Sequence, residues 1–202
     1  MQNRAKMLAV VHVCILSAML GFCAEKTPLT VEIAGSEIKI ANTNTPMDRA
    51  TYQSNQSQTL TIPADLEGLG GRSWIRLKSL DFGNEGVGQG VGHAVKIRIS
   101  CDDVTWESAN VATNTVDKLF ASNGQSVDRL EYSFAGAGCL LKVGKQYTLE
   151  LCDAAGNECK NLRYSLGKNA STIFGNMAYS DTYETMFQLN GTFIPASASI
   201  NF

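Results

Sequence analysis

The chain has 202 residues, of which 44% are hydrophobic and 18% are charged, a length and composition that suit one domain with a sizeable core. Lys and Arg number 17 and Asp and Glu number 19, which gives a formal net charge of −2. This balance, with no long run of like charges, argues against a nucleic-acid partner and against docking on anionic lipid.

The first 23 residues predict a secretory signal peptide. Arg4 and Lys6 precede a mostly apolar run from Met7 to Phe22, and small residues flank a cleavage point after Cys23. The run is too short to span a bilayer comfortably. We therefore expect a secreted, periplasmic or cell-surface protein with no membrane span after cleavage. No lipid anchor is expected on Cys23, because the bulky Phe22 stands where lipoprotein signals have a small residue.

Alternation of apolar and polar residues dominates the remaining chain, 24–202, and predicts short strands with one buried face each. Such strands are typical of antiparallel sheets packed face to face. We therefore predict an all-β fold, a single two-sheet antiparallel β-sandwich of jelly-roll type with little helix. The predicted strands are Leu29–Ile33, Glu37–Ala41, Thr59–Ile62, Ser73–Leu80, Val95–Ser100, Arg129–Phe134, Gln146–Leu151, Leu162–Leu166, Met186–Phe193 and Ser197–Phe202.

Turn residues separate these runs. Gly35, Gly124 and Gly144 stand in short turn-forming sequences, and Asn190-Gly191 also predicts a turn. The polar stretch Asn42–Gln58 is predicted to be a long surface loop. The glycine cluster Gly83–Gly92 precedes a strand rather than a helix, so a hairpin loop is expected there instead of a phosphate-binding loop. The only helix-like stretch is Ala170–Tyr179.

Four cysteines remain after removal of the signal peptide, and an even number in an oxidising compartment predicts disulfides. Cys152 and Cys159 bracket a turn-rich loop, where a bridge would staple a hairpin. That pairing leaves Cys101–Cys139 as a long-range bridge. The alternative is that some thiols are free and buried, because Cys in a core behaves as a small hydrophobe.

No catalytic residue and no required cofactor are predicted. Asp153, Asn157 and Glu158 could place oxygens around Ca²⁺, although Asp153 and Asn157 in so tight a turn also suit hydrogen bonds to the backbone. His93 stands alone without a nucleophile motif. The acidic residues show no spacing typical of a paired-carboxylate glycosidase site.

The most specific local pattern is Ser100-Cys101-Asp102-Asp103-Val104-Thr105-Trp106. It resembles the Ser-x-Asp-x-x-x-Trp hairpin of discoidin-type sandwich domains and the Asp-box turn of sialidases. In both families this element is mainly structural. More broadly, the order of strands, glycine loop and Trp hairpin across residues 59–193 looks like the concanavalin-A-like jelly-roll domains of secreted bacterial proteins.

The resemblance implies non-catalytic binding of a glycan or of another surface protein. Sugar sites use an aromatic face with polar groups at its rim, so we expect Trp106, Asp102 and Asp103 to bind the ligand, whereas Trp74 is expected in the core. The first alternative is a structural or adhesive subunit, because Phe193, Ile194, Ile200 and Phe202 resemble the closing strand of fimbrial subunits. The second alternative is a glycoside hydrolase.

Overall fold

The structure is a computed structural model that describes residues 29–42, 47–54, 58–66, 68–84, 94–112, 118–120, 124, 126–157, 162–168, 173–175 and 183–194. These residues contain sixteen β-strands and no helix, which confirms the all-β prediction. None of them belongs to a helix long and apolar enough for a membrane crossing. The predicted signal peptide, residues 85–92 of the predicted glycine loop, His93 and Ser197–Phe202 lie outside these ranges, whereas Gly83 belongs to the strand Trp74–Asn84.

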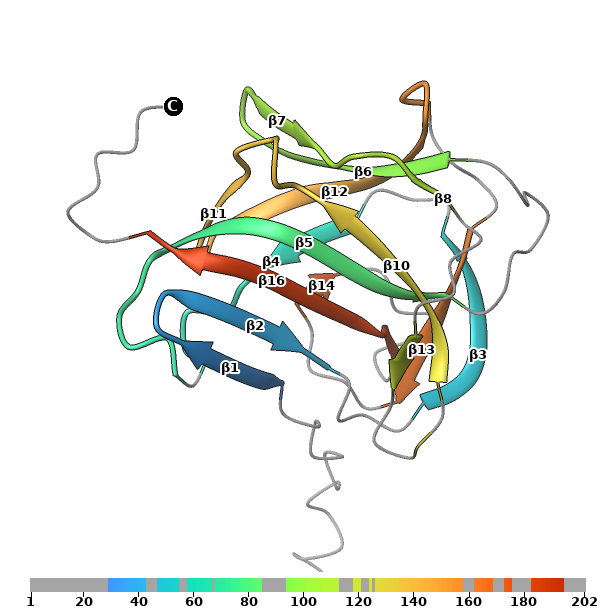
Figure 1. The fold of residues 1–202 in the computed structure, drawn as a ribbon, viewed down its shortest axis with the longest axis horizontal. Helices are drawn as coiled ribbons and strands as arrows, with labels where there is room; N and C mark the ends of the chain where they lie inside the picture. The colour runs from blue at the N-terminus through green and yellow to red at the C-terminus, as the bar shows by residue number, and fades with distance from the viewer. Residues whose placement is uncertain are drawn as a thin grey trace, which may run out of the picture.

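The strands form two antiparallel sheets (Figure 1). The main path of the larger sheet is β1 (Thr30–Ala34), β2 (Glu37–Ala41), β16 (Phe187–Phe193), β5 (Trp74–Asn84), β10 (Ser126–Ser133) and β9 (Lys118–Phe120). Its ten strands are completed by β3 (Met47–Ser54), β11 (Leu140–Lys142), β13 (Leu162–Lys168) and β15 (Tyr183–Thr185). The six strands of the smaller sheet are β14 (Phe174–Gly175), β4 (Gln58–Thr61), β12 (Gln146–Asp153), β6 (Ala94–Cys101), β7 (Val104–Glu107) and β8 (Val111–Ala112). The two-sheet β-sandwich is thus confirmed, while its jelly-roll topology stays a prediction.

One hydrophobic core joins the two sheets, as the alternating pattern predicts. Ile97 and Ile99 of β6 and Leu149 of β12 are buried from the smaller sheet. From the larger sheet, the rings of Phe82 and Tyr132 meet edge to face with centroids 5.9 Å apart. Burial of an apolar side chain of this size stabilises the fold by about 1.5–3 kcal/mol, so this alternation accounts for most of the cohesion between the sheets.

The predicted loop Asn42–Gln58 is wrong, because β3 spans Met47–Ser54 within it. Strand β3 pairs with β13 and with no other strand of the described residues. The ladder shifts register between Ser165 and Leu166. Backbone hydrogen bonds to one partner strand can hold such a strand in the sheet, and these bonds do not require apolar side chains. The sequence of β3 is therefore polar and shows little apolar alternation.

The predicted turn at Asn190-Gly191 is also wrong, because both residues lie inside β16. A Cβ at Gly191 would lie 2.6 Å from Ile75 Cγ2 and 2.8 Å from the backbone oxygen of Arg76. Gly191 is therefore required by the close approach of β16 to β5. The register shifts beside it, so Lys78 is the extra residue of a β-bulge on β5. The predicted helix-like stretch contains a strand instead, since β14 spans Phe174–Gly175.

The predicted bridge between Cys101 and Cys139 is wrong, because both carry free thiols. Cys101 ends β6 in the smaller sheet, where its thiol donates to the carbonyl of Gln146 (Sγ–O 3.5 Å). Cys139 is buried beside β5 of the larger sheet, and burial raises the pKa of its thiol to about 12. Cys152 is also free and buried. Its predicted partner Cys159 lies outside the described residues.

Candidate functional site

Few polar residues are buried among those that the structure describes, and two of them accept hydrogen bonds from the backbone of a strand. Asn42 Oδ1 accepts a hydrogen bond from the backbone nitrogen of Phe187 (2.8 Å). Ser108 Oγ accepts one from the backbone nitrogen of Ile97 (3.0 Å). The buried polar residues of the described chain are Asn42, Ser79, Asp81 and Ser108. Ser79 and Asp81 lie together on β5, so their burial has a different cause.

Asp81 lies on the solvent side of the larger sheet, opposite in alternation to the core residues Leu80 and Phe82. It is nevertheless 0% exposed. Its Oδ2 lies 3.1 Å from Arg129 Nε, while Oδ1 accepts no hydrogen bond from the described residues. A buried carboxylate with one oxygen unpartnered is costly unless something compensates it.

The pKa of Asp81 reflects the cost of this burial. Burial raises the pKa of its carboxyl group to about 6, a rise that the nearby Glu131 reinforces and the charge of Arg129 opposes. Since the ordinary value is 3.8, ionised Asp81 costs the fold about 3 kcal/mol at neutral pH. The site therefore holds a charge that the fold alone disfavours.

A polar network extends from Asp81 across three neighbouring strands. Asn190 and Gln188 of β16 direct their amide nitrogens at Asp81 Oδ2 (3.4 and 3.5 Å). Asn190 also donates to Ser79 Oγ (2.9 Å) and accepts from Gln188 Nε2 (3.1 Å). On the other flank, Arg129 of β10 pairs with Glu131 as well as with Asp81. Each side chain of the network is thus held by at least one other.

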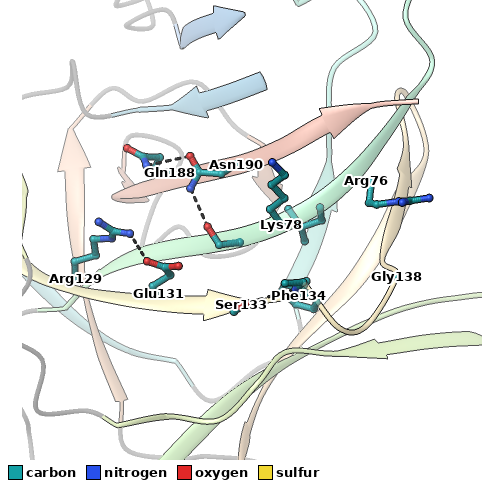
Figure 2. Close-up of a pocket in the computed structure, with 12 residues that line it drawn as sticks. Arg76, Lys78, Arg129, Glu131, Ser133, Phe134, Gly138, Gln188 and Asn190 are labelled. Carbon is teal, nitrogen blue, oxygen red and sulfur yellow. Dashed lines mark hydrogen bonds and ion pairs between the residues drawn. The ribbon is translucent and has the colours of Figure 1, made fainter. Parts of the chain in front are cut away.

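Apart from the buried Asp81, the side chains of this network line an open groove of about 580 Å³ (Figure 2). The turn after β10 bounds it, held to β5 by a hydrogen bond from the backbone nitrogen of Phe134 to the oxygen of Lys78 (2.7 Å). We call it the polar groove; its polar lining residues are Arg76, Lys78, Ser79, Arg129, Glu131, Ser133, Gln188 and Asn190. Its volume is that of a small-molecule site.

The predicted ligand residue Trp106 lies elsewhere, on β7 of the smaller sheet. Its indole is half-buried against the core, with its ring centroid 6.3 Å from that of Tyr147. Asp102 and Asp103 form the turn between β6 and β7, where Asp102 adopts a φ of 53°. Asp102 Oδ2 pairs with Lys145 Nζ (2.7 Å). The structure thus keeps the three predicted residues on one hairpin, and their role in binding stays a prediction.

Trp74, which was expected in the core, is half-buried at the start of β5. The Nζ atom of Lys142 lies 5.7 Å from its ring centroid. Trp74 borders a second groove, of about 590 Å³, together with Phe193, whose ring carries the guanidinium of Arg72 at 4.5 Å. Since cations of the chain itself cover both rings, this groove offers less free aromatic surface for stacking.

The turn expected at Asp153 uses its carboxylate locally. Asp153 Oδ1 accepts from the backbone nitrogen of Asn157 (2.9 Å), and Oδ2 accepts from the side-chain amide of the same residue (3.1 Å). Glu158 lies outside the described residues. Within the part of the chain that the structure describes, no group of three or more His, Cys, Asp or Glu side chains is placed to hold a metal ion.

No protein-family model matches the chain, and no curated protein or solved structure matches it. Function must therefore be inferred from the site itself. The sequence analysis missed that site because the predicted strand ended at Leu80, one residue before Asp81. A charged residue between Leu80 and Phe82 was the available signal, since an acid inside an apolar strand needs partners.

Proposed function

We propose that the protein is a secreted, non-catalytic β-sandwich that binds a glycan, and that the polar groove is its binding site. The observation that carries this proposal is the convergence of amide, hydroxyl and charged side chains from β10, β5 and β16 on one groove. Sugar hydroxyl groups both donate and accept hydrogen bonds, and such side chains offer both functions in fixed directions.

The burial of Asp81 supports this proposal. Proteins depart from the rules of stable folding mainly at functional sites, where the cost is compensated elsewhere. Here the Asp81 carboxylate orients Arg129 and Asn190 from beneath the groove. Side chains that are already oriented lose less conformational entropy when a ligand binds.

A glycan array with folded wild-type protein tests the proposal, with Asn190→Ala as the groove variant. Loss of the Asn190 amide removes hydrogen bonds to the ligand and to Ser79, and we expect affinity to fall about tenfold or more. Thr148→Ala on β12 of the smaller sheet is the matched control, because it truncates an exposed strand residue, and it should bind as wild type. Absence of glycan binding by the wild type would overturn the proposal.

Two further variants test the Trp106 hairpin as the site. Trp106→Phe keeps an aromatic ring against Tyr147, and Asp103→Ala removes an exposed turn carboxylate. If the glycan binds in the polar groove, both variants keep wild-type affinity. If these variants lose binding and Asn190→Ala does not, the binding site lies on the hairpin instead of in the polar groove.

Polymerisation by strand addition is the second candidate function. It is favoured by the position of β1 at the end of the main path of the larger sheet. A strand at such a position can pair with a strand of another chain. Light scattering over a range of concentrations should then detect oligomers, and a monomer at high concentration would exclude this function.

A further inference from the structure

We infer that the glycan is acidic and that a carboxylate of one of its sugars pairs with Arg76 at one end of the polar groove. This inference rests on the proposed function and adds the ligand class to it. The distribution of charge within the groove and the residues around Arg76 support it.

Three cations line the polar groove, and two of them are already paired with acids of the chain. Lys78 Nζ lies 2.7 Å from Glu37 Oε2. Arg129 pairs with both Asp81 and Glu131. The side chain of Arg76 is exposed, and its guanidinium makes no hydrogen bond or ion pair with any described residue. Arg76 is therefore the cation that a ligand can neutralise without displacing an existing pair.

The neighbours of Arg76 in the sheet do not compete for its charge. Its cross-strand partners are Leu140 on β11 and Thr192 on β16, and neither is ionisable. A guanidinium group presents a planar fork of donors that matches the two oxygens of a carboxylate. The groove thus offers one open bidentate position for an anion, and Figure 2 shows Arg76 standing apart from the paired side chains.

The rest of the groove would orient such a ligand. Asp81 and Glu131 surround the single cation Arg129, so this end carries an excess of negative charge and disfavours an anion. Ser79 lies three residues from Arg76 along β5, a separation of about 10 Å. A ligand with its carboxylate on Arg76 can therefore place the hydroxyl groups of a neighbouring sugar over Ser79 and Asn190.

Because the whole chain has a net charge of −2, long-range attraction does not explain a preference for anions, and the selectivity should depend on Arg76 itself. We would titrate the protein calorimetrically with a uronic-acid oligosaccharide and with the neutral oligosaccharide of the same linkage. Wild type should bind the acidic ligand about tenfold more tightly, the effect of one charge-assisted hydrogen-bonded pair.

Arg76→Gln should remove this preference, so that the acidic and the neutral ligand bind with similar affinity. Arg76→Lys should keep only part of it, because lysine loses the bidentate geometry. Lys39→Gln, which removes a cation that is paired with Glu32 outside the groove, should keep it. Equal or tighter binding of the neutral ligand by wild type would overturn the inference and leave the proposed function intact. Tighter binding of a sulfated oligosaccharide than of the uronic acid would also overturn it, whereas binding of no glycan would overturn both.

Discussion

The solvent sides of the two sheets both carry charged networks across three strands, but the networks differ in burial and in pairing. On the smaller sheet, Glu107 of β7 pairs with Lys96 (2.6 Å) and Arg98 (2.9 Å) of β6, and Arg98 also lies 3.5 Å from Glu150 of β12. All four side chains keep some contact with water, and each charge faces an opposite charge. This arrangement is that of an ordinary solvated sheet surface.

The network around Asp81 on the larger sheet has the opposite electrostatic character. Hydrogen bonds from Lys96 and then Arg98 lower the pKa of Glu107, whereas burial raises the pKa of Asp81. The fold thus favours the ionised form of Glu107 and disfavours that of Asp81. Asp81 therefore does not stabilise the fold through its charge, and this property is consistent with the role that we propose for the groove beside it.

Asp81→Asn should give the largest effect on stability. The variant removes a charge whose ionisation costs the fold about 3 kcal/mol at neutral pH. Because the folded pKa is raised, wild type is penalised only as pH rises from the ordinary value of 3.8 through about 6. The free energy of unfolding of the variant minus that of wild type should therefore increase by about 2 kcal/mol between pH 4 and pH 7.

Urea unfolding at several pH values measures this difference. Subtracting wild type from variant cancels the titration of other acids, and it also separates the pH-dependent part from any constant effect of the new amide. A difference that stays flat between pH 4 and pH 7 would mean that Asp81 is solvated, and the contrast between the two faces would then disappear.

Gly191→Ala should have the next largest effect, and it tests the strand contact that supports the groove. The new methyl group would meet Ile75 Cγ2 at 2.6 Å and the backbone oxygen of Arg76 at 2.8 Å. Overpacking of this kind destabilises a fold by about 1–3 kcal/mol. Gly136→Ala is the matched control, because no atom lies within 4 Å of its Cβ position and its φ is not positive. Equal stability of the two variants in urea unfolding would contradict the close approach of β16 and β5.

The difference between the two faces also explains how much could be predicted from sequence. Strands β6 and β12 were predicted because their buried residues alternate, and that alternation is a local property of the chain. Strand β3 was missed because its pairing with β13 depends on backbone hydrogen bonds, which leave little trace in side-chain pattern. The bulge at Lys78 was invisible for the same reason.

The polar groove could not be predicted because its network joins residues far apart in the chain. Arg129, Gln188 and Asn190 reach Asp81 only through the order β16, β5 and β10 in the sheet. Sequence reasoning instead selected Trp106, whose neighbours in the sequence are acidic. In the fold, the alternation of β7 turns this indole toward the core, which the same period-two argument could have predicted.

Glu107→Gln should have the smallest effect on stability and the opposite sign. The pairs it removes are partly exposed, so the loss at neutral pH should be about 1 kcal/mol or less. Because the folded pKa of Glu107 is lowered, its stabilisation is present above the ordinary value of 4.5 and is lost as pH falls through the folded value. Asp103→Asn, which removes an exposed turn carboxylate, is the control and should be as stable as wild type at neutral pH. A gain of stability at neutral pH in Glu107→Gln would mean that the fold disfavours ionised Glu107 as well, and the electrostatic contrast between the two faces would then be lost.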